Sequence, residues 1–381
     1  MKIVIVIDSW NEGNGAIVAT KRMVSELEKR GHKITVVTTG KYDGDFYTVP
    51  GFYLPGVEES MQNMGFLFGK GIKKTYKQAF KDADIVQIQF PFFMAKNAVN
   101  VAKKMGIPVL GACHIQPQNV ISAMGKENKL MEAALSALFN FCLFKQVPDI
   151  HCPSQFAADL IFNHGSRANF HIISNGIPEM YRPSNFERPD WFGDKFVIVN
   201  IGRHAFEKRQ HLLVEGVKRS KYKDNIQLLL CGKGENSEML RNISKDLPIK
   251  PLIEYVSDED KLKYLNTADL YLHSSIIELE SLSCLEAIGC GLPCLISDAP
   301  YSAAPQFALD ERFLFEKDNA DQLAEKIDYW YEHRKELPEI KKKVLAEAEN
   351  YRFRKCIDQM EELYIKIQQK TESARGYINV K

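Results

Sequence analysis

Residues 274–297 read SSIIELESLSCLEAIGCGLPCLIS, and this stretch decides the fold because it joins a predicted strand to a predicted helix. The apolar run 270–272 before it predicts a buried strand, and apolar residues at helical spacing predict a helix that ends near Gly291. Glu278 and Glu286 lie in this stretch with seven residues between them. We therefore expect Glu278 on a loop at the carboxyl end of a strand and Glu286 in the opening turns of the next helix. In open α/β sheets, ligands bind at this edge.

The residue types in this stretch suit a sugar nucleotide. An ionised carboxylate only accepts hydrogen bonds, so Glu286 could take the two adjacent hydroxyls of a ribose, while Glu278 could hold hydroxyls of a sugar. Backbone amides at Ser281 and Leu282 lie at the predicted helix N-terminus, which attracts a phosphate. An isolated pair of glutamates more often marks a solvated helix start, so this interpretation depends on motifs elsewhere in the chain.

Length, charge and cysteine content narrow the class of protein. The 381 residues predict two domains, and a net charge of +1 gives no general argument for binding nucleic acid. The eight cysteines are scattered without zinc spacing, which favours a reduced, cytosolic setting. The apolar run at residues 3–7 is too short for a signal peptide, and no segment predicts a membrane span.

The N-terminal part of the chain predicts alternating strands and helices. The first predicted elements are a strand, a helix and a strand, at residues 2–8, 18–30 and 33–37. The first connecting loop contains Gly13 and Gly15, which would let backbone amides approach a phosphate. A nicotinamide site would need a third glycine at Val18 and an acid after the second strand, so a dehydrogenase is set aside.

A candidate histidine follows a later strand. Strands are predicted at residues 84–90 and 109–113, and the second ends in His114. A lone histidine is more often a structural residue, but Gln116 and Asn119 close by favour a functional role for His114.

We place a domain boundary at residue 176. Polar, proline-containing residues follow it, and a new strand at residues 196–201 opens a second α/β unit. After that strand, Arg203 offers a fork of donors matched to phosphate oxygens and Lys208 offers a compact positive charge. The pair could bind a diphosphate without a metal, and a solvated loop is the alternative interpretation.

Two later positions are candidates for contact with a nucleotide. Gly232 follows the apolar run LLLC and would clear space for the ligand. Val256 belongs to a predicted strand, residues 253–256, beside which a base could stack.

Two segments are candidates for a membrane or an acceptor. Residues 42–77 interrupt the alternation with apolar residues and lysines that could meet anionic lipid. The residues that carry this interpretation are Phe66, Phe68, Lys70, Lys73 and Lys74. A loop packed on its own domain remains the alternative. Residues 130–144 are apolar on most faces and predict either a core helix or the lining of an acceptor groove.

Several motifs together resemble a known family. SSIIE (274–278) followed by LEAIGCGLP (285–293) is similar to the signature of retaining glycosyltransferases of family 4, which have the GT-B fold. The closer resemblance is to bacterial cholesterol α-glucosyltransferases and bacterial ceramide α-galactosyltransferases. It is carried by CHIQPQN (113–119), HCPSQF (151–156), ISNGI (173–177) and QFALDERFLFE (306–316). Glu280 and Ser281 stand where many members have an aromatic residue and a glycine, so we expect a phosphate loop of different shape.

The resemblance implies an α/β fold of two doubly wound, Rossmann-like domains that face each other across a cleft. Residues 1–176 would form the acceptor-binding, membrane-facing domain and residues 177–355 the nucleotide-sugar domain. Residues 356–381 would form a helix that returns to the first domain. We therefore expect an enzyme attached peripherally to the inner face of the plasma membrane.

The resemblance also implies the reaction. A retaining α-hexosyltransferase would move galactose or glucose from a UDP-sugar to the hydroxyl of a membrane lipid, with ceramide or a sterol expected first. The catalytic residues would be His114, at the donor sugar, with Arg203, Lys208 and Glu278. Retention would follow from attack on the same face as the departing diphosphate, which takes the proton of the acceptor.

Two acidic segments are candidates for a metal site, and two other functions are compatible with the sequence. The acidic groups at residues 43–45 and 258–260 are interpreted as a turn and a helix start, so we expect no essential metal or other cofactor. A diacylglycerol or saccharide acceptor is the first alternative. A nucleotide-binding scaffold without catalysis is the second.

Overall fold

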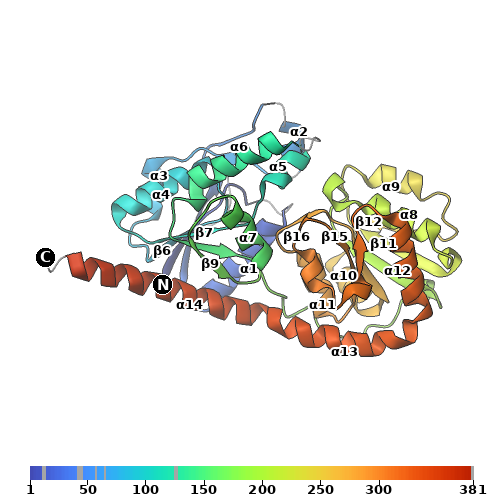
Figure 1. Ribbon diagram of the computed structural model, residues 1–381. Coiled ribbons are helices and arrows are strands. Elements are labelled where there is room, and N and C mark those ends of the chain that lie inside the picture. Colours follow the sequence, from blue (N-terminus) through green and yellow to red (C-terminus); the bar gives the residue numbers. More distant parts are fainter. Residues whose placement is uncertain (11–13, 41–45, 56–57, 64–65, 124–127, 379–381) are drawn as a thin grey trace. The chain divides into compact units, whose positions relative to one another are not determined.

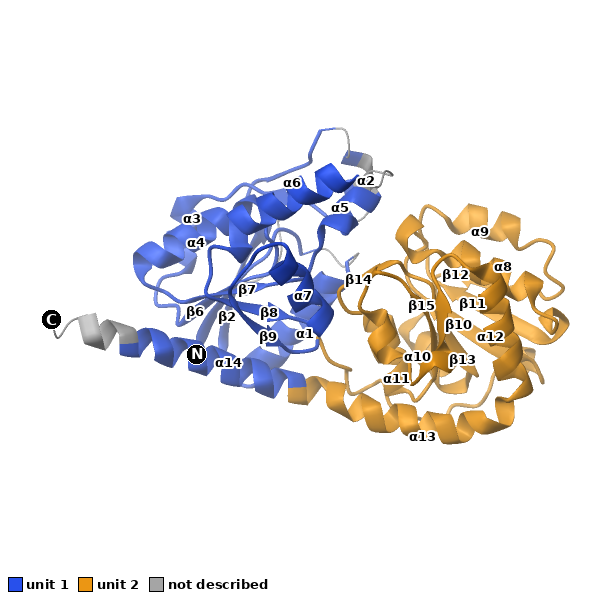
Figure 2. Cartoon of the chain, in the orientation of Figure 1, with its two compact units in different colours: residues 1–174, 356–381 blue, residues 175–355 orange. Residues whose placement is uncertain are grey.

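The computed structural model describes residues 1–10, 14–40, 46–55, 58–63, 66–123 and 128–378. The chain forms two compact units (Figure 2). Unit 1 comprises Met1–Ser174 and Cys356–Lys381, and unit 2 comprises Asn175–Lys355. The division falls two residues before the boundary placed from the sequence.

Unit 1 is built on a seven-stranded sheet in the order β3-β2-β1-β6-β7-β8-β9, with every neighbouring pair parallel. The strands are β1 (Lys2–Val6), β2 (Lys33–Thr39), β3 (Phe46–Val49), β6 (Ile85–Ile88), β7 (Val109–Ala112), β8 (Asp149–Cys152) and β9 (Asn169–Ile172). The central strands are buried along their length, which explains their near-continuous apolar sequence. The order changes direction between β1 and β6, and such switch points place ligand sites at the carboxyl ends of the strands.

Helices pack around this sheet (Figure 1). They are α1 (Gly15–Lys29), α2 (Glu58–Asn63), α3 (Lys73–Ala79), α4 (Phe93–Met105), α5 (Pro117–Ala123), α6 (Lys129–Phe139), the π-helix η1 (Asn140–Phe144) and α7 (Gln155–Asn163). A small antiparallel pair, β4 (Gly51–Phe52) and β5 (Phe68–Gly69), lies outside the main sheet. α1 begins three residues before the predicted helix because Asn14 caps it, accepting a hydrogen bond from the backbone N–H of Ala16 at 2.8 Å.

The C-terminal helix α14 (Phe353–Ile378) contributes to unit 1 from Cys356 onward. Its residue Tyr364 is fully buried and donates a hydrogen bond to the side-chain oxygen of Gln87 on β6. Arg30, which follows α1, forms ion pairs with Asp358 and Glu361 of α14. These contacts hold the end of the chain to the first sheet.

Replacing Tyr364 with alanine is expected to lower the free energy of unfolding by about 3–5 kcal/mol, because it leaves a cavity and removes the partner of a buried amide. The midpoint of urea denaturation measures this loss. Ile365→Ala, at the exposed neighbouring position, is the control and should cost less than about 1 kcal/mol. Equal midpoints for the two variants would contradict the packing described.

Unit 2 repeats the plan with a six-stranded parallel sheet in the order β12-β11-β10-β13-β15-β17. The strands are β10 (Phe196–Ile201), β11 (Ile226–Cys231), β12 (Leu252–Glu254), β13 (Leu270–His273), β15 (Cys294–Asp298) and β17 (Leu314–Glu316). The helices are α8 (Gln210–Arg219), α9 (Ser237–Ile243), α10 (Asp258–Thr267), α11 (Leu282–Gly289), α12 (Ala320–Glu332) and α13 (Leu337–Ala348). The direction changes between β10 and β13, so residues after these two strands share one edge of the sheet.

The two parallel sheets, each flanked by helices, confirm the α/β, doubly wound fold class predicted from the sequence. A small parallel pair, β14 (Ile277–Glu278) and β16 (Tyr301–Ser302), lies outside the main sheet of unit 2, and β14 follows the carboxyl end of β13. All eight cysteines are buried, and they divide equally between the units.

Aromatic residues near β5 correct one expectation. Phe66 and Phe68 are buried, whereas the sequence interpretation placed them at a membrane. Their rings contact Phe92 at 5.6 and 4.7 Å between centroids, within a cluster of aromatic residues. Burial of ring area inside the domain drives this packing, so these two side chains do not reach a lipid. Lys70, Lys73 and Lys74 are exposed.

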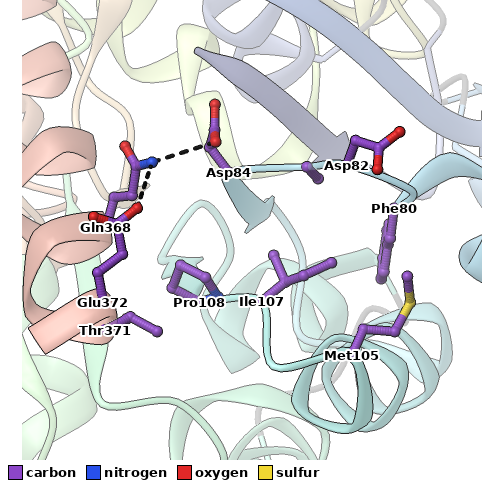
Figure 3. Close-up of a pocket in the computed structure, with 10 residues that line it drawn as sticks. Phe80, Asp82, Asp84, Met105, Ile107, Pro108, Gln368, Thr371 and Glu372 are labelled. Carbon is purple, nitrogen blue, oxygen red and sulfur yellow. Dashed lines mark hydrogen bonds between the residues drawn. The ribbon is translucent and has the colours of Figure 1, made fainter. Parts of the chain in front are cut away.

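A cavity of about 240 Å³ opens on unit 1 (Figure 3). It lies at the amino ends of β6 and β7, where Asp84 and Pro108 precede the strands, and the side chain of Gln368 reaches Asp84 and Glu372 there. This is the edge opposite the one that holds Gly15 and His114. We do not place the functional site in it, because parallel sheets bind ligands at their carboxyl edge.

Candidate active site

The loop after β10 positions two of the predicted residues. Arg203 follows the strand, and Lys208 ends the 3-10 helix η3 (Phe206–Lys208). The hydroxyl of Ser274, which follows β13, donates to the carbonyl of Lys208 at 2.7 Å, and the N–H of Ile276 donates to that of Glu207 at 2.9 Å. The carboxyl ends of β10 and β13 are thus tied together at the switch point of the sheet.

Lys208 and Glu278 meet at this edge. The Lys208 Nζ atom lies 2.6 Å from Glu278 Oε1, and both side chains are largely buried. The backbone of Glu278 is held by pairing of β14 with β16 and by a hydrogen bond from the Ala303 N–H at 2.9 Å. Burial opposes ionisation of Glu278, but Lys208 and His273 outweigh it and lower the pKa of Glu278 to about 2. Burial likewise opposes the charge of Lys208, yet Glu278 and Glu207 raise its pKa. The pair is therefore charged at neutral pH.

Arg203 adds a second cation. Its Nη2 atom lies 2.5 Å from Glu207 Oε1, and its Nη1 atom lies 3.8 Å from Glu235 Oε2. The side-chain amide of Gln210 donates to the Arg203 carbonyl at 2.9 Å, which fixes the backbone there. Arg203 is near enough to Lys208 to act on its pKa. A guanidinium and an ammonium on one loop can together bind a diphosphate.

The helix α11 presents its N-terminus close to Glu278. Ser281 caps the helix, accepting a hydrogen bond from the Cys284 N–H at 3.3 Å, and Leu282 is the first helical residue. Glu280, expected to give the phosphate loop a different shape, accepts hydrogen bonds from the backbone and side-chain nitrogens of Asn175 at 2.9 and 2.7 Å. Its carboxylate therefore anchors the loop to the beginning of unit 2.

Glu286 has a different partner from Glu278. It is buried on α11, and the Lys261 Nζ atom of α10 lies 3.6 Å from its Oε2 atom. The two glutamates therefore flank the N-terminal turn of α11, each beside a separate lysine. Contact of Glu286 with a ribose stays a prediction.

The structure corrects the reason for Gly232. A Cβ atom there would lie 1.9 Å from the carbonyl oxygen of Gly202, so the glycine allows the loops after β10 and β11 to touch. The side-chain position at Gly232 is therefore filled by backbone, and contact of this residue with a nucleotide stays a prediction. Val256 is half-buried two residues after β12, which ends at Glu254 rather than at Val256 as predicted.

Two predicted residues lie in unit 1, at the carboxyl edge of its sheet. Gly15 is exposed as the first residue of α1, where backbone amides are available to an anion. His114 follows β7, with its ring 5.6 Å from that of His151. Burial, aided by His151, lowers the pKa of His114 to about 3, so its imidazole is neutral at physiological pH. Its contact with a donor sugar stays a prediction.

The acidic groups considered for a metal were interpreted as structural. Asp258 and Asp260 open α10, and the Ser257 hydroxyl accepts from the Asp260 N–H at 3.0 Å, as expected for a capped helix start. Residues 43–45 and Gly13 lie outside the described part of the chain. Within the described ranges, no cluster of histidine, cysteine and acidic side chains could hold a metal ion.

One residue of the site was missed from the sequence. His273 ends β13, is almost fully buried, and lies with its Nε2 atom 3.4 Å from Glu278 Oε1. The signal was a histidine at the end of an otherwise apolar strand, five residues before a glutamate.

Comparison with known families agrees with this geometry. The model of glycosyl transferases group 1 matches residues 182–346, and the model of glycosyltransferase family 4 matches residues 13–179. The chain is a glycosyltransferase of group 1 and family 4. The two matches follow the two units, so the site on unit 2 lies in the group 1 part of this glycosyltransferase.

Two curated relatives of this glycosyltransferase are named alpha-monoglucosyldiacylglycerol synthase. The protein from Streptococcus pneumoniae is 23% identical over 79% of this chain and 72% of its own length. The protein from Acholeplasma laidlawii is 24% identical over 74% of this chain and 76% of its own length.

The solved structure of Anabaena HepE confirms the GT-B fold. Anabaena HepE, solved in complex with UDP, superposes with a TM-score of 0.75 at 15% identity and covers 96% of this chain and 100% of its own. The catalytic domain of cholesterol-alpha-glucosyltransferase from Helicobacter pylori is 40% identical over 41% of this chain and 99% of its own, with a TM-score of 0.38.

Proposed function

We propose that this glycosyltransferase moves a hexose, with glucose first, from a UDP-sugar to the hydroxyl of a membrane lipid, with retention at the anomeric carbon. The observation that carries the donor half is the charged pair of Lys208 and Glu278, with Arg203 on the same loop, at the switch point of unit 2. The UDP complex of the HepE structure and the names of the curated relatives support it.

The donor chemistry follows from the charges. Departure of the diphosphate from the anomeric carbon loads negative charge onto its oxygens, and cations already held in place stabilise that transition state. Arg203 and Lys208 would bind these oxygens. Lys208 Nζ and His273 Nε2 lie 2.6 and 3.4 Å from the same oxygen of Glu278, Oε1, so Oε2 is the oxygen that we assign to hydroxyls of the sugar. Because the two side chains supply the positive charge, we propose that no divalent metal is required.

The lipid half of the proposal rests on an exposed apolar face. Along α6 and η1, Leu130 is 80% exposed and Phe141 is 60% exposed. The face consists of exposed apolar residues at helical spacing, namely Leu130, Ala133, Ala134, Ala137 and Phe141. We call it the α6 face, and Figure 1 shows α6 at the periphery of unit 1. A helix packed only inside a core would not leave such a face exposed, so the sequence alternative of a core helix holds for its other side alone.

Lysines accompany the α6 face. Lys96 of α4 lies 4.2 Å from the ring of Phe141, and its neighbour Asn97 donates to the carbonyl of Gly71 at 3.4 Å. Gly71 lies between exposed Lys70 and the exposed Lys73 and Lys74. Apolar side chains that can enter a headgroup region, beside cations that attract anionic lipid, suit one occupant, the surface of an anionic bilayer. No helix in the described residues is long and apolar enough to cross a membrane. We therefore propose peripheral binding at the inner face of the plasma membrane.

The names of the two curated relatives described above indicate which acceptor and which sugar to expect first. Both names contain glucose and diacylglycerol, and neither contains ceramide or galactose. Diacylglycerol therefore moves ahead of ceramide, which the sequence resemblance favoured together with a sterol.

One experiment tests the whole proposal. Purified protein in detergent is incubated with UDP-glucose or UDP-galactose and with diacylglycerol, a sterol, ceramide or a soluble saccharide, with and without a chelator. Released UDP and the anomer formed are measured. We expect an α-glucosyl lipid and equal rates with the chelator. Transfer to saccharide alone would replace the lipid by a sugar acceptor, and UDP binding without turnover would indicate a scaffold.

Membrane binding has its own prediction. Changing Leu130 and Phe141 together to aspartate should weaken binding to anionic vesicles about tenfold or more, since two exposed apolar groups that would enter the bilayer are lost and negative charge is added. Co-sedimentation with vesicles of phosphatidylglycerol and phosphatidylcholine measures it. Phe162→Asp on α7, where the ring is 47% exposed and lies 4.3 Å from the guanidinium of Arg167, is the matched control. Equal binding by both variants would remove the α6 face from the proposal.

A further inference from the structure

His273 is a buried histidine that lies beside Glu278. His273 Nε2 lies 3.4 Å from Glu278 Oε1, and Lys208 Nζ lies 2.6 Å from the same oxygen. Lys208 comes from the loop that the diphosphate is proposed to contact, whereas His273 ends a central strand and is almost fully buried. The carboxylate is therefore held from two sides, by one cation at the ligand edge and by one group beneath it.

The strand explains why the imidazole points at Glu278. All four residues of β13 are buried, and side chains two apart in a strand share a face, so Tyr271 and His273 lie together. Their rings are stacked, with 6.2 Å between centroids and an interplanar angle of 21°. Register with β15 places His273 beside Ile296 in the sheet. The imidazole has little freedom to turn away, because neighbours on both strands confine it.

The titratable groups around His273 are Glu278 on β14, Lys208 on η3, Cys284 on α11 and Tyr271 on β13. Glu278 and Cys284 favour its charged form, whereas the ammonium of Lys208 opposes it. Burial alone would lower the pKa of His273, but Cys284 and Glu278 outweigh it and raise that pKa to about 9. Burial raises the pKa of Cys284, but Cys294 and His273 outweigh burial and lower that pKa. A cation under Glu278 at neutral pH agrees with the geometry.

We propose that His273 is a positioning residue. Its imidazolium keeps Glu278 ionised and oriented when the ammonium of Lys208 also contacts the diphosphate of the donor and therefore interacts less strongly with Glu278. This inference rests on the proposed function, because it takes Lys208 as a ligand of the diphosphate. Without a second cation, a buried carboxylate that loses part of its partner would gain a proton and cease to accept two sugar hydroxyls. His273 does not touch the substrate and acts through Glu278.

The pH dependence gives the sign of the effect. As the pH rises through about 9, His273 loses its proton while Lys208, whose pKa is raised from its higher ordinary value, remains charged. The value of kcat/KM in the wild type should therefore fall in this range. In His273→Gln, a neutral donor replaces the ring, so kcat/KM at pH 7.5 should be about tenfold lower and this alkaline decline should disappear. The dissociation constant of UDP should change less than about twofold, since Arg203 and Lys208 remain.

The test joins these kinetics to a titration that needs no turnover. The imidazole of His273 is identified among the nine histidines by its absence in His273→Gln, and NMR follows its titration with and without UDP. We expect a charged ring at pH 7.5 in both states and a pKa lowered by about one unit in Glu278→Gln. His333→Gln on unit 2 is the kinetic control and should leave the pH profile unchanged.

The outcomes separate the two proposals. A neutral His273 at pH 7.5, an unchanged alkaline decline in His273→Gln, or parallel losses of UDP affinity and activity would each overturn the inference. Absence of transfer from any UDP-sugar, with the imidazole still charged and coupled to Glu278, would instead refute the proposed function.

Discussion

Replacing Lys208 with alanine is expected to lower kcat/KM for sugar transfer about 100-fold or more. The change removes a cation that would stabilise the departing diphosphate, and it leaves the buried carboxylate of Glu278 without its partner at 2.6 Å. UDP should also bind more weakly, because the diphosphate loses a charged donor. The measurements are initial rates of lipid glycosylation and the dissociation constant of UDP.

A control for this substitution exists in the same unit. Lys342 and Glu339 on α13 also form a lysine–glutamate pair, at 2.7 Å, but both side chains are mostly exposed. Lys342→Ala should leave activity within about twofold, since exposed ion pairs contribute little. If Lys208→Ala kept its activity within threefold while folding normally, the loop after β10 would not be the diphosphate site.

Replacing Glu278 with glutamine is expected to reduce kcat about 100-fold or more without weakening the binding of UDP. The amide keeps the size of the side chain but loses the charge that accepts sugar hydroxyls and that pairs with Lys208 and His273. UDP affinity should stay the same or increase, because the ammonium of Lys208 is released from its partner. Binding of UDP and of UDP-glucose is measured separately, and only the sugar-dependent part should fall.

Glu339→Gln, at the exposed pair on α13, is the matched control for this second change. Of the two variants of the buried pair, only Lys208→Ala should thus lose UDP affinity. A loss of UDP affinity in Glu278→Gln equal to that in Lys208→Ala would mean that the pair acts only as structural support.

The stabilising effect of the pair of Lys208 and Glu278 in the wild type should also persist in mildly acidic solution, as urea denaturation at different pH values would measure. The folded pKa of Glu278 is depressed from 4.5 to about 2, so its stabilising effect is complete above about pH 4.5, declines as the pH falls below that value and is lost once the pH has fallen through about 2.

The fold was accessible from the sequence because buried parallel strands are apolar on both faces. KIVIV at β1 and IQLLLC at β11 are runs of this kind, and both are central or next to central in their sheets. Element ends were less accessible, as at α1, whose cap is Asn14, and at β12, which ends at Glu254. Such ends depend on single hydrogen bonds rather than on periodicity.

The site was accessible where function follows position along the chain. Residues that follow a strand share the carboxyl edge of the sheet, so Arg203, Lys208 and Glu278 were predicted together, and the structure pairs Lys208 with Glu278. Contacts between distant elements were not accessible. Lys261, the partner of Glu286, comes from α10, and nothing in its local sequence marks it.

Two corrections have the same origin in tertiary packing. Phe66 and Phe68 join rings from the β6–α4 region, and the absent side chain of Gly232 makes room for the carbonyl of Gly202 rather than for a ligand. A sequence states which groups are apolar or small, but not which neighbour will occupy the space beside them. His273 was not predicted for the same reason, because Glu278, the acid beside it in the structure, lies five residues further along the chain.

The burial of every cysteine provides a built-in reporter of local opening. Cys113, Cys142, Cys152 and Cys356 belong to unit 1, and Cys231, Cys284, Cys290 and Cys294 belong to unit 2. An alkylating reagent can label each thiol only when the structure around it opens, so mass spectrometry of labelled peptides would record breathing of the two halves independently. Added UDP should then slow labelling of the four cysteines of unit 2. The four cysteines of unit 1, labelled at an unchanged rate, provide an internal reference in the same sample.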